Sequence, residues 1–324
     1  MFEVTYSSRQ NKNYLFYCLF YLFEITPEDP DKHIDTKKYL EFLERLAYHY
    51  LHHVYLKSAS NKKPTRFDDI ILRWLKMYTS CLKMYTNIKN NTDSSPPTED
   101  GLNQGTEGSN PVSGKETINK AERHKNLFEK TYGNGEKKPR RYIPLFVFNY
   151  LDYKIWSEYH KKPNGEELSG FFGRLGCKDF GLDNFRGFYF SRTRDSLEHY
   201  FPAANVKTEK TPNSDDNTTN DTDDNVPNEI QANCFGNFAM IGRNINSSGS
   251  NRDPQTKLVL YYKDRSKKIP KASVASLKFQ IMMQICENEG TWGWDQIRIH
   301  QDKMLNILFD IPDNTEKQDD SQGS

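Results

Sequence analysis

A long polar stretch in the first half of the chain limits what the chain can fold into. Residues Asn87–Asn119 contain no aromatic residue and only four aliphatic ones, and they are rich in Asn, Thr, Ser, Pro and Gly. A segment of this composition cannot bury enough apolar surface to offset the entropy lost on ordering it. We therefore predict a flexible linker over residues 90–119, between a helical region at 1–89 and a second domain at 120–312.

A second polar stretch interrupts that second domain. Residues Asn205–Glu229 carry seven acidic and two basic residues and hardly any apolar ones, so we expect a disordered surface insert at 205–229. Such an insertion costs little, because the closure entropy of a loop rises only with the logarithm of its length. The residues after Pro312 are also polar and predict a loose tail at 313–324.

Most of the remaining sequence favours α-helices. Aromatic residues make up 13% of the chain, so Tyr and Phe can supply a core that the aliphatic content does not. Apolar residues recur at helical spacing in most segments between the polar stretches. We expect helices at Tyr14–Glu24, Asp35–Lys57, from near Asp68, Ile118–Lys130, Pro144–Lys161, Pro254–Lys263, Ala272–Glu287 and Asp295–Leu308, and a strand at Phe188–Phe190. The predicted fold is mainly α with a small β hairpin, in the α+β class.

Charge and cysteine usage exclude several classes of protein. The net charge is +1, with 45 basic and 44 acidic residues, so overall charge gives no argument for nucleic-acid binding. The five cysteines form no C-x-x-C pair, which argues against a disulfide framework or a zinc–cysteine site and favours a reduced, cytoplasmic protein. The apolar run Tyr14–Ile25 is shorter than the roughly 20 residues that span a bilayer, so no membrane association is expected.

Residue types suited to hydrolysis gather between Leu197 and Lys263. Glu198 and His199 form a pair, Asn237 follows a glycine, and Asn246 comes nine residues later. We expect a ββα arrangement with His199 on the first strand, Asn237 entering the second strand and Asn246 beside the following helix. Such an arrangement lets a groove of nucleic acid lie over one metal ion.

The chemistry of these side chains suggests their roles. His199 is the predicted general base, because its ordinary pKa of about 6.5 leaves it largely neutral at cellular pH. Glu198 and Asn246 would supply oxygen ligands, which favour Mg²⁺ or Mn²⁺ over zinc. The metal would neutralise the phosphate and stabilise the leaving 3′-oxygen. Asn237 is expected to orient His199 or to brace the loop through its amide.

Two sets of polar side chains are candidates for contacts with nucleic acid. The first lies around the predicted site and comprises Arg192, Arg194, Asn251, Arg252, Lys257 and Lys263. The second is a basic cluster directly ahead of the helix at Pro144, and comprises Lys137, Lys138, Arg140 and Arg141. This cluster is either the solvated entry of a helix or a patch that contacts phosphates, and the sequence favours the two interpretations equally.

Each of these signals also has an ordinary explanation. A Glu-His pair occurs by chance in many proteins, asparagine beside glycine is a common turn residue, and Asn246–Asn251 would pass as a loop. Their combination in this order, with the apolar residues Phe238–Ile241 between them, is much less expected by accident.

The stretch resembles the C-terminal HNH-like nuclease domain of GmrSD-type modification-dependent restriction endonucleases. The segments that carry the resemblance are Ser196–Pro202, Phe235–Ile241 and Asn246–Asn251, with Asn149–Trp156 and Trp294–Leu308, so that it covers about residues 120–310. It implies a mainly α fold with a small ββα-metal (HNH-like) element. It also implies a metal-dependent endonuclease that hydrolyses DNA in defence against foreign or modified DNA.

The chain departs from that family's pattern in several places. Ala203 stands where glutamine is usual, Phe238 replaces leucine, and the acidic insert is longer than expected. No D-G-Q-Q-R-type motif is found. The resemblance therefore implies either a nuclease half whose ParB-like nucleotide-hydrolysing domain is on a separate partner chain, or a fragment of a longer gene product. The alternative function is a catalytically inactive module of a split restriction system that binds nucleic acid or a partner.

Overall fold

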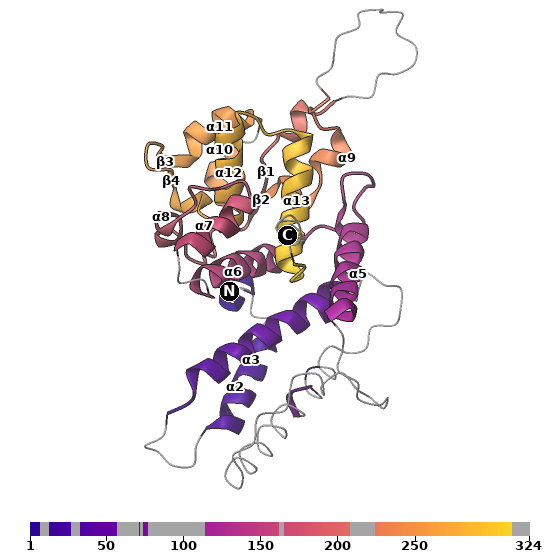
Figure 1. Cartoon of the computed structure of the whole chain (residues 1–324), viewed down its shortest axis with the longest axis vertical. Coiled ribbons are helices and arrows are strands. Elements are labelled where there is room, and N and C mark those ends of the chain that lie inside the picture. Colours follow the sequence, from indigo (N-terminus) through magenta and orange to yellow (C-terminus); the bar gives the residue numbers. More distant parts are fainter. Residues whose placement is uncertain are drawn as a thin grey trace, which may run out of the picture. The chain divides into compact units, whose positions relative to one another are not determined.

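A computed structural model describes residues 1–6, 13–26, 33–56, 71, 74–76, 114–161, 165–207, 224–249 and 251–312. The described part is mainly helical, as predicted (Figure 1). The chain divides into two compact units, one made of residues 1–5 and 121–324 and the other of residues 6–120. None of the described helices is long and apolar enough to cross a membrane.

The predicted linker, insert and tail fall largely outside the described residues. Residues 90–113, 208–223 and 313–324 are not among them. Helix α5 (Gly114–Tyr132) begins inside the predicted linker and runs across the boundary between the two units.

The unit of residues 6–120 is built around aromatic side chains. Its regular elements are α2 (Asn13–Ile25), α3 (Thr36–His49) and the π-helix η2 (Tyr50–Leu56). Asp35 begins α3 as predicted, because its carboxylate accepts hydrogen bonds from two backbone N–H groups of the first turn. The rings of Tyr21 and Phe42 stack with centroids 4.1 Å apart and join α2 to α3.

Helix α2 is less covered than its composition predicts. The sequence suggested a helix buried on most sides, but one face is exposed at Leu15, Phe16, Leu19 and Phe23. The tyrosines of the opposite face are buried and supply the packing that holds the helix. Of the helix predicted from near Asp68, only Ile71 and residues 74–76 are described, and they are helical.

The unit of residues 1–5 and 121–324 contains the predicted nuclease region. Its elements are α1 (Phe2–Thr5), α5 from Ala121, α6 (Leu145–Lys161), α7 (Gly165–Arg174), α8 (Leu182–Arg186), β1 (Ser196–His199), η5 (Ala203–Asn205), α9 (Glu229–Ala232), η6 (Phe235–Asn237), β2 (Phe238–Ile241), α10 (Arg243–Gly249), α11 (Pro254–Tyr261), β3 (Tyr262–Asp264), β4 (Ile269–Pro270), η7 (Ala272–Val274), α12 (Leu277–Glu289) and α13 (Trp294–Leu308).

Three helices form the core of this unit. Helices α6, α12 and α13 pack on one another, and both α6 and α12 contact β2 (Figure 1). Helix α12 is buried at every position from Leu277 to Cys286. Asp152 on α6 accepts a hydrogen bond from the backbone N–H of Lys278 at 2.9 Å, so it holds the start of α12 against α6.

Strands β1 and β2 form an antiparallel pair at the surface of this core. The register pairs Ser196 with Ile241 and His199 with Phe238. Helix α10 follows β2 and contacts β1. The acidic insert leaves and re-enters this region at one point, because the N–H of Lys207 donates to the carbonyl of Pro227 at 3.0 Å.

Several predicted elements differ from the structure. The helix expected from Ala272 begins at Leu277, after a short 3₁₀ turn at Ala272–Val274. Phe188–Phe190 is not a strand, because the rings of this segment lie against the buried guanidinium of Arg194. The helix predicted over Pro254–Lys263 ends at Tyr261, where the chain turns extended to pair β3 with β4. The last helix begins at Trp294 after Gly293 and not at an Asp295 cap. Each difference reflects a contact of particular side chains or strands, which apolar spacing does not report.

Candidate active site

His199 is the last residue of β1 and is held by Asn233. The Nε2 atom of His199 lies 2.9 Å from Oδ1 of Asn233, at the end of α9. The amide nitrogen of Asn233 donates to the carbonyl of Glu229 at 2.8 Å, so its oxygen faces the imidazole. Nε2 must therefore carry the proton, which leaves the lone pair on Nδ1 to accept one.

Burial favours the neutral form of this imidazole. Desolvation lowers the pKa of His199 below its ordinary value of 6.5, and the hydrogen bond to Asn233 and the charge of Glu198 only partly oppose it. The side chain is half-buried and its ring lies edge-on to that of Phe238. A neutral imidazole with a defined tautomer and a free lone pair is what a general base requires.

Glu198 lies on the other face of the β1–β2 ribbon from His199. Successive side chains of a strand alternate between its faces, and the Glu198 side chain is only 3% exposed. Its Oε1 atom lies 2.5 Å from Nζ of Lys257 and accepts a hydrogen bond from the hydroxyl of Tyr261 at 2.9 Å. Glu198 therefore faces the core, bound to the side chains of α11.

The ammonium of Lys257 connects this ion pair to the backbone of the site. It donates to the carbonyls of His199 at 2.5 Å and Tyr200 at 3.2 Å, in addition to Glu198. Its three N–H groups are thus all bonded, within a side chain that is fully buried. The buried pair holds the end of β1, from which His199 projects.

The predicted metal ligands do not fit a shared cation in this arrangement. Glu198 is occupied by Lys257, whose ammonium already takes the place of a cation against the carboxylate. Within the described ranges, no three His, Cys, Asp or Glu side chains gather as a metal-binding group. A metal bound beside His199 would not have Glu198 as a ligand, since the two side chains lie on opposite faces of the ribbon.

Asn246 contacts β1, the strand that carries His199. It was expected beside the following helix but belongs to a helix itself, α10. Its amide nitrogen donates to Oγ of Ser196 at 2.8 Å and to the carbonyl of Leu197 at 3.0 Å. Leu197 is two residues before His199, or about 7 Å along an extended strand. The structure thus brings Asn246 to β1.

Asn237 braces the loop that follows β1. Its amide oxygen accepts from the N–H of Phe201 at 2.7 Å and from the indole of Trp292 at 3.1 Å. Its amide nitrogen donates to the carbonyls of Phe201 and Ala232, both at 2.9 Å. Of the two roles expected for Asn237, the structure therefore has the brace, and Asn233 is the residue that orients His199.

Three of the residues predicted to contact nucleic acid are bonded to other groups of the protein, two of them in its interior. Lys257 is bound to Glu198, and the guanidinium of Arg194, only 5% exposed, donates to the carbonyls of Tyr189 and Ala272. Arg192 is exposed and forms an ion pair with the carboxylate of Glu3. Arg194 and Lys257 therefore do not have the position that a phosphate contact requires.

The other three of these residues are exposed. They are Asn251, Arg252 and Lys263. The first two lie in the turn between α10 and α11, and the last is on β3. They stay candidates for contacts with nucleic acid.

Sequence reasoning missed Asn233. This residue stands four positions before Asn237, in the same turn-rich segment, but nothing in its spacing distinguishes it from an ordinary helix-end asparagine. Its contact with His199 joins positions 34 residues apart, and the long acidic insert lies between them. Only the pairing of β1 with β2 brings these positions together.

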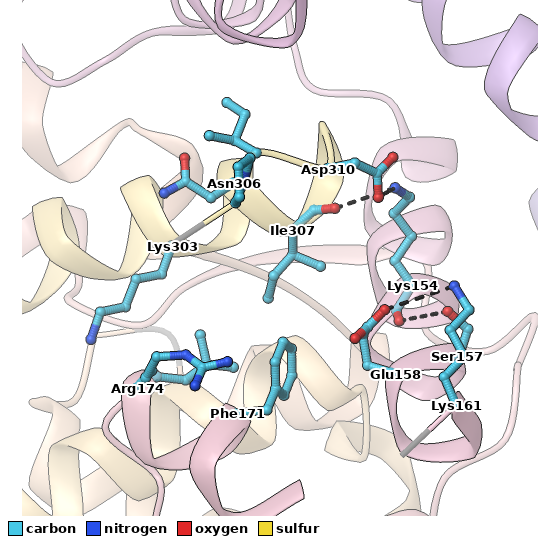
Figure 2. A pocket seen from close by; sticks show the side chains of 13 residues that line it. Lys154, Ser157, Glu158, Lys161, Phe171, Arg174, Lys303, Asn306, Ile307 and Asp310 are labelled. Atoms are coloured by element: carbon cyan, nitrogen blue, oxygen red, sulfur yellow. Dashed lines mark hydrogen bonds and ion pairs between the residues drawn. The ribbon is translucent and has the colours of Figure 1, made fainter. Parts of the chain in front are cut away.

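A separate hollow of about 320 Å³ lies between α6, α7 and α13. Figure 2 shows Lys154 directed at Asp310, with Nζ and Oδ1 2.5 Å apart, and Lys161 directed at Glu158. None of the described residues predicted for the site lines this hollow. Lys154 and Lys161 are thus already paired with carboxylates, and we assign the hollow no part in the chemistry of His199.

Comparison with known proteins identifies a family. Residues 119–307, more than half of the chain, match the family described as GmrSD restriction endonucleases, C-terminal domain. The matched span contains β1, β2 and α10, together with His199, Asn233 and Asn246. Nothing among curated proteins or solved structures matches the chain.

Proposed function

The chain belongs to the family of GmrSD restriction endonuclease C-terminal domains, and from this premise we propose that it hydrolyses phosphodiester bonds of DNA with His199 as general base. We propose that β1, β2 and α10 serve as an HNH-like ββα element. The single observation that carries the proposal is the hydrogen bond from His199 Nε2 to Asn233, because it leaves Nδ1 to take a proton from water.

The proposed reaction is an attack of water on phosphorus. Nδ1 of His199 removes a proton from the water as the new oxygen–phosphorus bond forms. The bond between phosphorus and the 3′-oxygen breaks, and the leaving oxygen takes up a proton from solvent. The products are a 5′-phosphate and a 3′-hydroxyl.

The proposal includes Mg²⁺ or Mn²⁺ as cofactor, although not with Glu198 as ligand. Magnesium in nucleic-acid enzymes is often held by one or two protein oxygens, with waters and substrate phosphates completing its shell. The amide oxygen of Asn246 is the predicted ligand that the proposal keeps, since the hydrogen bonds from Asn246 to β1 use its amide nitrogen. When bound, such a cation would offset the charge of the phosphate.

Plasmid cleavage tests the proposal. Purified protein is incubated with supercoiled DNA and Mg²⁺ or Mn²⁺, beside His199→Ala and a control variant, His33→Ala, whose side chain is exposed in the other unit. Nicked or linear DNA from the wild type and the control, but not from His199→Ala, supports the proposal. Equal cleavage by all three proteins would remove it.

A second candidate is a module that binds DNA without cutting it. The pairing of Glu198 with Lys257 favours it, because this carboxylate is the acidic group nearest to His199 in sequence and it is not available to a metal. Salt-dependent DNA binding without cleavage under any divalent metal would support this candidate. Cleavage that depends on His199 would exclude it.

The biological setting is also part of the proposal. A restriction function in defence against foreign or modified DNA suits a cytoplasmic protein. We propose that a separate ParB-like, nucleotide-hydrolysing chain is its partner. Co-purification with such a chain, and stimulation of cleavage by it in the presence of nucleotide, would support this arrangement.

A further inference from the structure

A strongly basic loop joins α5 to α6. It runs from Lys137 to Tyr142, and we refer to it as the basic loop. Every residue of the loop is exposed, and the side chain of Tyr142 is 95% exposed. It carries Lys137, Lys138, Arg140 and Arg141 within five positions, which is the cluster that sequence alone could not assign.

The basic loop has a defined conformation. The backbone N–H groups of Arg140 and Arg141 both donate to the carbonyl of Thr131, at 2.9 and 3.2 Å. Just ahead of the loop, Gly135 adopts a φ of +85° and lies so close to Trp294 that a Cβ atom would be 2.1 Å from its ring. The backbone of the loop is therefore fixed to the end of α5, and the segment just ahead of it packs on the start of α13.

The basic loop lies beside the residue that orients His199. With α9 it lines a hollow of about 360 Å³, whose walls are Lys138, Pro139, Arg140, Arg141 and Tyr142 on one side and Glu229, Ile230 and Asn233 on the other. Asn233 is also the hydrogen-bond partner of Nε2 of His199. One asparagine therefore belongs to both the basic hollow and the proposed catalytic group.

Two cations of this hollow, Lys138 and Arg140, differ from two arginines near the start of β1. Arg192 and Arg243 each form an ion pair with a carboxylate from another part of the unit. Within the described residues, the side chains of Lys138 and Arg140 have no such partner, and Glu229 is the acidic residue that lines the hollow. An excess of positive charge without carboxylate partners suits a polyanion.

We propose that the basic loop is a clamp for the DNA backbone next to the bond that His199 cleaves. Lys138 and Arg140 bind phosphate oxygens of the nucleotides that flank that bond, and the hydroxyl of Tyr142 donates to a further phosphate oxygen. The inference rests on the proposed function for the identity of the ligand. It adds a surface that binds the DNA backbone beside His199.

A binding experiment on the full chain tests the clamp separately from catalysis. All proteins carry His199→Ala, so that the DNA probe, a labelled 30-base-pair duplex, stays intact. The affinity for this duplex is measured at several salt concentrations for three proteins. The first is the His199→Ala parent, the second also carries Lys138→Ala and Arg140→Ala, and the third instead carries Arg265→Ala and Lys267→Ala. The last pair removes the same charge from the β3–β4 hairpin, on the other side of this unit from α9 (Figure 1).

The clamp predicts a large change in one variant only. Log affinity falls as log salt rises, and removal of Lys138 and Arg140 should make this fall less steep. The magnitude of the slope should decrease by about two, roughly one for each phosphate that the variant no longer binds. The hairpin control should keep the slope of the parent. Equal slopes for all three proteins would overturn the clamp, as would a parent that does not bind DNA.

Cleavage by proteins that retain His199 separates the two proposals. The variant without Lys138 and Arg140 should show a raised KM with kcat close to that of the wild type, since neither residue touches the reacting atoms. If the wild type cleaves DNA and this variant has the same KM as the wild type, the clamp alone is overturned. If DNA binding weakens on removal of Lys138 and Arg140 but the wild type does not cleave DNA, the proposed catalysis alone is overturned.

Discussion

Oε1 of Glu198 and Nζ of Lys257 lie 2.5 Å apart, and the two side chains are 3% and 0% exposed. Both residues were predicted to meet a ligand, Glu198 a metal and Lys257 a phosphate. The structure has them meeting each other across the β1–α11 contact. Lys257 also donates to the carbonyl of His199, so the pair is bonded to the end of β1 from which His199 projects.

Replacing one member of this pair should destabilise the protein strongly. In Lys257→Met the Glu198 carboxylate stays buried without its cation, which typically costs about 3–5 kcal/mol. The double variant Glu198→Gln with Lys257→Met should lose less than the sum of the single changes, because no charge is then left unpaired. Urea denaturation followed by circular dichroism measures both, and a loss below about 1 kcal/mol in Lys257→Met would contradict the assignment.

The pH dependence of cleavage should report His199. Because burial lowers its pKa below 6.5, the base form is present at neutral pH and kcat/KM should fall only as pH drops below that value. In Asn233→Asp a carboxylate accepts the Nε2 proton and stabilises the imidazolium, so the acidic limb should move to higher pH. Asn126→Asp adds the same charge at an exposed position of α5 and should leave the limb unmoved.

Stability should also fall on acidification, because of His300. This side chain is only 1% exposed, Nδ1 lies 2.8 Å from the carbonyl of Gly236, and Nε2 has no hydrogen-bond partner within the described residues. Burial, with the nearby charge of Lys278, lowers its pKa well below 6.5.

The unfolded chain binds a proton at His300 near pH 6.5 and the folded protein does not, so stability is present above pH 6.5 and lost as pH falls below it. His300→Gln removes the titrating group and should flatten this part of a curve of unfolding free energy against pH. An unchanged slope would show that His300 does not carry the effect.

Removal of metal should abolish cleavage, which EDTA followed by added Mg²⁺ or Mn²⁺ can show. Asn246→Ala should raise the metal concentration needed for half-maximal rate, whereas Asn244→Ala, exposed on the same helix, should not. Thermal unfolding of both variants checks that removing the hydrogen bonds between Asn246 and β1 has not unfolded the protein. Full activity in EDTA would contradict the cofactor proposal.

Helices and strand positions were predictable where the signal is local. The apolar spacing before Lys161 predicts α6 from neighbouring residues. In the same way, the carboxylate of Asp35 predicts the start of α3. The strand that carries His199 was expected from the order of Glu198, His199 and Asn237, and the structure has it at Ser196–His199.

Partners of charged residues were not predictable in the same way. Arg194 and Lys257 have the residue type of a phosphate ligand, but what decides their role is burial by segments far along the chain. The same holds for Asn233, which meets His199 only after β2 pairs with β1. The basic loop could be placed only once α9 was seen to line the same hollow.

The rate of DNA cleavage by His199→Ala tests the central claim most directly. Matched thermal unfolding first shows that both proteins are folded. Single-turnover cleavage of supercoiled plasmid by His199→Ala and by the wild type is then compared at a pH of about 7.5, where the His199 side chain is neutral. Each reaction is run with and without imidazole added to the buffer. The account predicts a rate roughly 10²–10⁴ times lower, partly restored by imidazole acting in place of the missing base. A folded His199→Ala protein that cleaves at the wild-type rate would contradict it.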